Sequence, residues 1–300
     1  MSGLQWLALV LGLPVIAAAG IAVLGRQRWS DATRLLTRRL AATRIDGSIH
    51  PPPPPSRYDA REIEGLPAPV QRYFRAALRD GQPLVATAEV ELAGTINLSP
   101  TGAQWKPFRS RQHVVTRRPG FLWDAEVSLL PGVVVRVVDS YIAGEGLLRA
   151  AVLGWFTVAE VQGGGEIARG ELMRYFAEAA WYPTALLPSQ GVQWEAVDDA
   201  SANATLVEGP FTLTLLFRFN AAGLIDTFRA ESRGAMVGKD LVLMPWEGRW
   251  SDYRVHGDMT LPFAGEVAWV RPEGRKTYFR GQVAALSHQW AASSTPATLS

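Results

Sequence analysis

Strand-like segments separated by short turns fill most of the chain after Pro83, and they constrain the fold more than any other feature. Segments such as LVATAEVELAGTINL, GFLWDAEVSLL and FTLTLLFRFN are rich in β-branched and aromatic residues, which favour strands. Pro119-Gly120 and Pro131-Gly132 are typical turn pairs between such segments. These connections are too short to contain crossover helices, so we expect the strands to pair antiparallel.

One helical segment interrupts the strands. The stretch GELMRYFAEAAWYPTALLP at residues 170–188 has apolar residues at helical spacing and predicts a helix over 166–182. A second, short amphipathic helix is expected within residues 66–80, docked on the same domain. Roughly ten antiparallel strands do not remain a flat sheet, because they curl, close or split into layers. The prediction is an α+β fold, mostly antiparallel β, with a strongly curved sheet or open barrel and a covering mid-chain helix.

The N-terminal region has a different pattern, typical of a membrane anchor. Leu4 to Leu24 is a continuous apolar stretch broken only by Gln5, which is long enough to span a bilayer as a helix. A cleaved signal peptide is the alternative, but Ser2 and Gly3 supply no positively charged n-region. No Lys or Arg precedes the stretch, and several Arg follow it, at positions 26, 28, 34, 38, 39 and 44. This asymmetry predicts a single-pass protein of the cell membrane with a cytoplasmic domain, and an extracytoplasmic domain is the alternative.

These patterns divide the chain into four parts. We expect a transmembrane anchor at 1–25, a basic juxtamembrane helix and proline-rich linker at 26–57, one curved-sheet domain at 58–290, and a disordered tail at 291–300. In the second part, Ser30 is expected to cap a separate helix over residues 31–42. The leucines and arginines of that helix suit either a position on anionic lipid or a solvated spacer.

Composition excludes several function classes. The chain has no cysteine, so disulfides, thiolate nucleophiles and Cys-ligated metals are excluded. The net charge is +2 without a dense basic block in the C-terminal 200 residues, which argues against binding to nucleic acid. GGGEIA at residues 163–168 lies outside a βαβ unit, and no H-E-x-x-H or G-x-S-x-G motif occurs. No cofactor, metal or catalytic residue is therefore predicted, and protein partners stay unknown.

The predicted mid-chain helix carries the first set of candidate site residues. Glu171, Arg174, Tyr175, Glu178 and Tyr182 fall on one side of it. Trp181 and Tyr182 lie at its end, where a pocket rim could form. The alternative is a solvated face, because Arg174 is spaced to pair with both Glu171 and Glu178 on the helix itself.

Charged residues of three neighbouring strand segments form the second set. Asp124 and Glu126 share a strand face, and Arg111 and Arg136 could meet them if the strands pair in order. Such a face, covered by the helix, would make a charged interior, whereas an ion-pair brace or the outer face of the sheet are the alternatives. Trp246 and Arg249, in MPWEGRW, suit a pocket wall or the core. The full candidate set is Arg111, Asp124, Glu126, Arg136, Glu171, Arg174, Tyr175, Glu178, Trp181, Tyr182, Trp246 and Arg249.

Several longer phrases resemble a bacterial family of unknown function with a membrane anchor. They are LPAPVQRYFRAAL, RPGFLWDAEVSLLPGVVVRVVDSYIAGEG, ARGELMRYFAEAAWYPTALLP, MPWEGRWSDY and LPFAGEVAWV. The resemblance covers about residues 66–286. The arrangement is also similar to the half-barrels of lipoprotein carriers, and this second resemblance implies a curved sheet that holds acyl chains beneath covering helices.

Three hypotheses for function follow from the sequence. The first is non-enzymatic binding of an apolar or amphiphilic ligand such as a lipid. The second is an enzyme of unknown reaction that uses the carboxylates and arginines, with two acids dividing acid and base roles. The third is an interaction scaffold at the membrane. An apolar cavity would favour the first. A cleft where Glu171 or Glu178 approaches Asp124 or Glu126, with strongly shifted pKa values, would favour the second. A filled core beneath an exposed apolar patch would favour the third.

Overall fold

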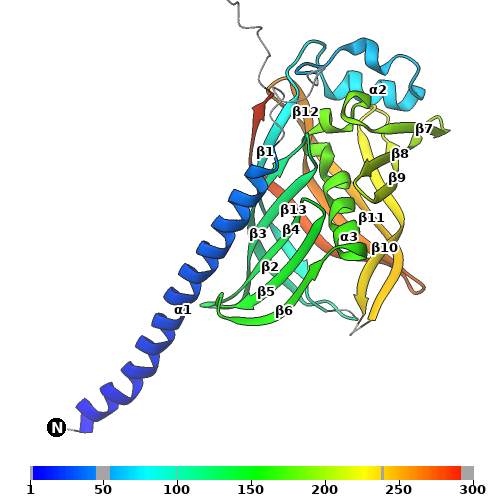
Figure 1. Ribbon diagram of the computed structural model, residues 1–300. Helices are drawn as coiled ribbons and strands as arrows, with labels where there is room; N and C mark the ends of the chain where they lie inside the picture. Colours follow the sequence, from blue (N-terminus) through cyan, green and yellow to red (C-terminus); the bar gives the residue numbers. More distant parts are fainter. Residues whose placement is uncertain (1–2, 45–54, 100, 238–239, 292–300) are drawn as a thin grey trace, which may run out of the picture.

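The computed structural model describes residues 3–44, 55–99, 101–237 and 240–291, and the side chains of residues 3–19 and 236–237 lie outside the described set. In the described residues, thirteen strands form one antiparallel sheet in the order β6-β5-β4-β3-β2-β1-β13-β12-β11-β10-β9-β8-β7 (Figure 1). The strands are β1 Val85–Asn97, β2 Trp105–Val115, β3 Gly120–Leu130, β4 Val133–Ile142, β5 Glu145–Val152, β6 Phe156–Gly163, β7 Gln193–Asp198, β8 Ser201–Glu208, β9 Phe211–Phe219, β10 Ile225–Val237, β11 Asp240–His256, β12 Met259–Arg271 and β13 Gly274–Trp290. The mostly antiparallel prediction is confirmed.

Three α-helices accompany the sheet in the described residues: α1 Gly3–Ala42, α2 Ala68–Ala77 and α3 Gly165–Ala177. Short 3-10 turns occur as well: η1 Ala60–Ile63, η2 Glu178–Trp181, η3 Pro183–Leu186 and η4 Pro188–Gln190. Helix α2 is the amphipathic helix expected after residue 66, and it buries one apolar face made of Val70, Tyr73, Phe74 and Ala77.

Helix α3 joins the two edges of the sheet and fills its concave side. It follows β6 in the chain and precedes β7, and these are the two edge strands of the sheet. It contacts β4 and β5 in one half of the sheet and β9 and β10 in the other (Figure 1). The sheet is therefore curved around the helix, as the sequence predicts.

The predicted mid-chain helix is correct in position but too long. Regular α-helix ends at Ala177, and the chain continues as the 3-10 turns η2 and η3. Pro183 explains why helical geometry does not continue through Tyr182, because a proline disfavours that geometry at the residue before it. Tyr182 accordingly has φ −138° and ψ 62°, outside the helical region.

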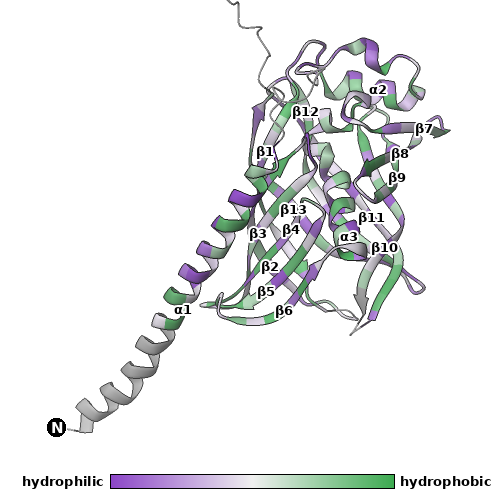
Figure 2. Cartoon of the chain, viewed as in Figure 1, coloured by the Kyte–Doolittle hydropathy of each residue, from purple (hydrophilic) through white to green (hydrophobic). Residues whose placement is uncertain are grey.

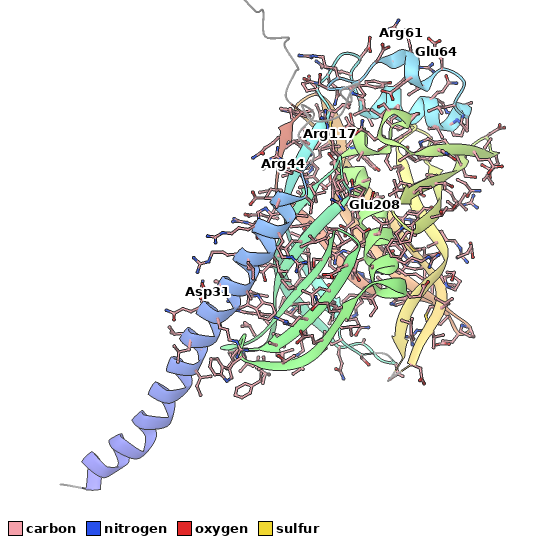
Figure 3. All side chains as sticks on the ribbon, viewed as in Figure 1. Asp31, Arg44, Arg61, Glu64, Arg117 and Glu208 are labelled. Carbon is pink, nitrogen blue, oxygen red and sulfur yellow. The ribbon has the colours of Figure 1, made fainter. Side chains whose placement is uncertain are left out.

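Helix α1 packs on the convex face of the sheet, which corrects the expectation of a separate juxtamembrane helix capped by Ser30. It runs without a break through Ser30, and Trp29 Nε1 donates a 2.9 Å hydrogen bond to Asp124 Oδ1 on β3. Trp29 and Leu40 are buried against apolar residues of β2, β3, β4 and β5. Asp31 lies on the side of α1 away from the sheet (Figure 3). The helix docks because several outward positions of these strands are apolar, and burying them beneath the helix removes apolar surface from water.

No helix in the described part of the chain is long and apolar enough to cross a membrane. The predicted anchor, Leu4 to Leu24, falls mainly on residues whose side chains lie outside the described set, so it stays a prediction. Prolines 51–54 of the predicted linker and residues 292–300 of the predicted tail also lie outside the described residues.

Substitution of Trp29 tests the docking of α1. Trp29→Ala removes a buried ring and its hydrogen bond to Asp124, and should destabilise the docked helix by about 3 kcal/mol. Hydrogen exchange of the full chain, followed by mass spectrometry, should show faster exchange in residues 27–42. Leu35→Ala, on the exposed side of the same helix, should change protection by no more than about 0.5 kcal/mol. Equal protection of residues 27–42 from hydrogen exchange in the two variants would contradict the docking of α1.

Candidate functional site

A cavity of about 580 Å³ lies between α3 and the concave face of the sheet. Apolar side chains from both halves of the sheet form much of its wall, among them Trp123, Val137, Leu148, Val267, Trp269 and Phe279. Charged side chains also line it, namely Asp139, Glu171, Arg174, Glu178 and Arg233. We call these five residues the charged cluster. The cavity therefore combines an apolar wall with buried charge.

Arg174 of α3 ties the helix to the sheet. Its Nη1 donates to Asp139 Oδ2 of β4 at 2.5 Å, and its Nε donates to Glu178 Oε1 at 2.8 Å. Gln112 of β2 completes the ring, because it accepts from Arg174 Nη2 at 3.3 Å and donates to Glu178 Oε2 at 2.7 Å. The guanidinium group thus has acceptors in two strands and in the turn that follows its own helix.

Aromatic rings of β3 flank the same guanidinium group. Its central carbon lies 5.0 Å from the ring centroid of Phe121 and 4.9 Å from that of Trp123, within the range of cation–π attraction. Burial opposes the charge on Arg174, but attraction to Glu178 and Asp139 outweighs it and raises the pKa of Arg174. Arg174 is therefore a permanent positive charge at the centre of the site.

Arg233 forms a second buried cation on the opposite side of the cavity. Its Nε donates to the backbone oxygen of Gly170 at 3.1 Å, and its Nη2 lies 3.7 Å from Glu171 Oε1. Its guanidinium group also lies over Trp246 and Trp269, at 4.3 and 5.6 Å from the ring centroids. Arg233 is held by an acid, a helix backbone oxygen and two rings.

A bulge in β10 turns Arg233 into the cavity. The pairing of β10 with β11 shifts register between Ala230 and Arg233, so that Ala230 pairs with Trp246 and Arg233 pairs with Met244. In a regular strand, residues an odd number apart point to opposite faces, so Arg233 would face away from Ala230. The extra residue in the bulge reverses this.

Glu171 and Asp139 form a buried pair of carboxyl groups. Glu171 Oε2 and Asp139 Oδ1 are both buried without a hydrogen-bond partner. Burial, followed by repulsion from Asp139, raises the pKa of Glu171 well above its ordinary value of 4.5. The raised pKa favours the protonated form of Glu171 beside Asp139. The charges of Arg174 and Arg233 are then balanced by the carboxylates of Asp139 and Glu178.

The structure brings only part of the predicted site together. Glu171, Arg174, Glu178 and Trp246 line the cavity. Tyr175, Trp181 and Tyr182 do not, because they are buried in the core: Tyr182 Oη donates to the backbone oxygen of Tyr175 at 2.6 Å, and Trp181 Nε1 donates to that of Pro262 at 3.0 Å. The phenol of Tyr175 donates to the backbone oxygen of Thr116 at 3.3 Å.

The strand residues of the second predicted set do meet, but on the convex face. The register pairs Arg111 with Asp124 and Glu126 with Arg136, and Arg136 Nη2 lies 2.5 Å from Glu126 Oε1. Asp124 accepts the hydrogen bond from α1, and Arg111 forms ion pairs with Glu89 and Glu91 on the same outer face. Of the alternatives that the sequence left open, the structure shows the outer face of the sheet with an ion pair, because Trp123 and Ala125 take the concave positions of β3 and α3 does not cover these residues.

Arg249 is also outside the cavity. It is exposed on β11, with its Nε 3.8 Å from Asp226 Oδ1. Its neighbours Trp246 and Trp250 are both buried. The structure therefore separates the two residues that the sequence proposed for one pocket wall.

Three polar residues of the site are missing from the predicted set: Gln112, Asp139 and Arg233. Asp139 has a signal in the sequence, since it shares a strand face with Val135 and Val137 and pairs with Trp123. Gln112 also pairs with Trp123 and could have been found in the same way. Arg233 has no such signal, because its orientation depends on the bulge. Among the described residues, no group of three or more acids and histidines is arranged to hold a metal ion.

Comparisons with known proteins place these features in context. Residues 64–288 match the model of a family described as "Family of unknown function (DUF6920)". A LolA superfamily protein from Nitrosomonas europaea has 10% sequence identity and a TM-score of 0.38, over 77% of this chain and 94% of that one. A putative outer membrane lipoprotein-sorting protein domain from Vibrio parahaemolyticus has 8% identity and a TM-score of 0.38, over 77% and 92%. No curated protein matches the chain. Both resemblances expected from the sequence are found.

Removal of Arg174 should be costly because it leaves buried acids without a cation. Arg174→Ala should lower the free energy of unfolding by about 3–5 kcal/mol, measured by urea denaturation of the full chain. Arg249→Ala removes an exposed arginine and should change that free energy by less than about 0.5 kcal/mol. Similar losses in the two variants would contradict the role given to Arg174.

Glu171 should make stability fall as pH rises. The folded pKa of Glu171 lies above its ordinary value of 4.5, so the folded state holds a proton that the unfolded state has lost. The contribution of this proton to the free energy of unfolding is complete below pH 4.5. It is lost as pH rises through the folded pKa of Glu171, by at most about 1.4 kcal/mol per pH unit. Relative to Glu171→Gln, the wild type should lose stability from pH 4.5 upward. Glu273→Gln, at an exposed site, should show the same dependence of the free energy of unfolding on pH as the wild type. If Glu171→Gln also shows the wild-type dependence, the role given to Glu171 is refuted.

Proposed function

The chain belongs to the DUF6920 family, for which no function is established, and we propose that its sheet domain is a non-enzymatic binding protein for an amphiphilic ligand such as a lipid. The cavity beneath α3 is the observation that supports this proposal. Its volume of about 580 Å³ falls within the range of about 300–1,000 Å³ common among small-molecule pockets. A packed core would leave no such space, since protein interiors are normally filled.

The apolar wall and the charged cluster suit two ends of one ligand. Burial of an alkyl chain or ring against Val137, Leu148 and Val267 is favoured by the hydrophobic effect. A polar head can then reach the cluster around Arg174 and Glu171. Because that cluster balances its own charges, a further net charge would be buried without a counter-charge, at high cost. The proposed ligand therefore has a neutral or zwitterionic head.

Membrane anchoring is part of the proposal. The apolar stretch Leu4–Leu24 belongs to helix α1, and its length suits a bilayer span. The arginines that follow it favour the cytoplasmic side for the domain, and an extracytoplasmic domain is the alternative. An anchored domain would stay close to a source of amphiphiles.

Acid–base catalysis is a second candidate function, favoured by the pair Glu171 and Asp139. Two neighbouring buried carboxyl groups can divide acid and base roles when burial raises the pKa of one of them, as it does for Glu171. Glu171→Gln separates the two functions, because glutamine mimics the protonated acid in shape but cannot exchange the proton. Retention of the ligand by this variant supports binding. Chemical conversion of the bound ligand by the wild type, lost in Glu171→Gln, would support catalysis instead.

The cavity can be filled to test the binding proposal. Native mass spectrometry of the purified full chain should show a bound mass of lipid size, which extraction with organic solvent removes. Val267→Trp places a large ring in the cavity wall and should reduce the bound fraction by about tenfold or more, equivalent to about 1.4 kcal/mol. Val255→Trp makes the same change at an exposed position and should bind as the wild type does. A ligand-free wild type, or equal binding by both variants, would refute the proposal.

A further inference from the structure

Exposed apolar side chains gather at one end of the sheet. The antiparallel order places the turns after β1, β3, β5, β10 and β12 at the same end. Large apolar residues next to three of these turns are exposed, among them Leu130 at 66%, Phe156 at 55% and Leu243 at 56%. We call this set the apolar rim, and it comprises Leu130, Trp155, Phe156, Leu241, Val242 and Leu243. Single exposed apolar residues are ordinary, but several at the same end of one sheet indicate a contact surface.

The two ends of the domain differ in character. Hydrophobic residues colour the free end of the β10–β11 hairpin in Figure 2. The opposite end carries α2 and the preceding segment, where Arg61 and Glu64 project outward (Figure 3). The domain therefore has a hydrophobic end and a charged end, which lie at opposite ends of its strands.

Helix α1 leaves the sheet at the level of the rim. A Cβ atom on Gly25 would overlap the backbone oxygen of Leu153, so the helix lies directly against the turn between β5 and β6. The guanidinium carbon of Arg28 lies 5.4 Å from the ring centroid of Trp155. From this point, α1 extends away from the sheet toward its N-terminus (Figure 1). The exposed Leu24 and Val23 come next in that direction, and they end the apolar stretch proposed as the anchor.

We propose that the apolar rim rests on the lipid bilayer in which α1 is anchored, an inference that depends on the proposed anchoring. The contact between Gly25 and Leu153 places the rim at the boundary between the apolar stretch and the first arginines of α1. This boundary corresponds to the membrane surface, where aromatic residues and arginines are both enriched. Trp155, Phe156 and Arg28 supply these residue types in one place.

The rim also connects the bilayer with the cavity. Leu148 and Leu241 line the cavity and are themselves partly exposed, and Leu241 belongs to the rim. The apolar wall of the cavity is thus continuous with the surface that faces the bilayer. An amphiphile can enter the cavity from the membrane without its apolar part crossing water.

Site-specific fluorescence tests the rim, because the chain contains no native cysteine. The full chain is reconstituted in vesicles of phosphatidylcholine and phosphatidylglycerol, with an environment-sensitive label on Phe156→Cys, Leu243→Cys or Val255→Cys. Val255 is the matched control, since it is 77% exposed and lies at the other end of the sheet. Spin-labelled lipids should quench the labels at 156 and 243 about threefold or more above the label at 255.

A label on Val10→Cys, within the apolar stretch, distinguishes failure of the anchor from failure of the rim. Quenching at 10, 156 and 243 supports the proposal. Quenching at 10 with no excess at 156 and 243 over 255 overturns the rim while leaving the anchor. Absence of quenching at all four positions overturns both. A different result would identify a second copy of the chain as the partner of the rim. In that case the rim labels would report an apolar environment in lipid-free detergent at high protein concentration, and spin-labelled lipids would not quench them in vesicles.

Discussion

The position of α3 depends on the need to pair the charge of Arg174 inside the protein. An unpaired guanidinium group would be very costly at this depth, and its partners lie on β2, on β4 and in the turn after the helix. These bonds fix both the rotation of α3 and its height above the sheet. Arg174 lies in the last turn of α3, and the cavity lies between the helix in this position and the apolar walls of the two sheet halves.

The same sheet has different roles on its two faces. The concave face carries the charged cluster and the aromatic rings that surround Arg174 and Arg233. The convex face has its own ion pairs, such as Arg136 with Glu126, and a small apolar patch beneath α1. Docking on that patch aligns α1 with the strands, so the end of the sheet with the apolar rim and the apolar part of the helix lie together. The proposed ligand cavity and the proposed membrane contact would thereby belong to one sheet.

Sequence patterns succeeded where the signal was local and failed where it depended on curvature. The spacing of Glu171, Arg174 and Glu178 places them together on any helix, and all three line the cavity. Alternation along β3 correctly separated Asp124 and Glu126 from Trp123. It could not say which of these faces is concave, so both placements stayed open until the structure showed Asp124 and Glu126 on the convex face. Asp139 was accessible to the same reasoning, whereas Arg233 was not, since a bulge reverses its direction.

The sequence by itself determined the antiparallel strands, the single mid-chain helix and the charged row on that helix, because turn length and residue periodicity act over a few neighbouring residues. Tertiary structure alone decided that the helix bridges both halves of the sheet, that α1 docks on the convex side, and that Arg174 and Arg233 meet their acids across a cavity. These outcomes depend on the twist and curvature of the sheet, which has thirteen strands in the described residues and sums small rotations from strand to strand. No short segment of the sequence records the total twist of the sheet, so no local pattern could predict these outcomes.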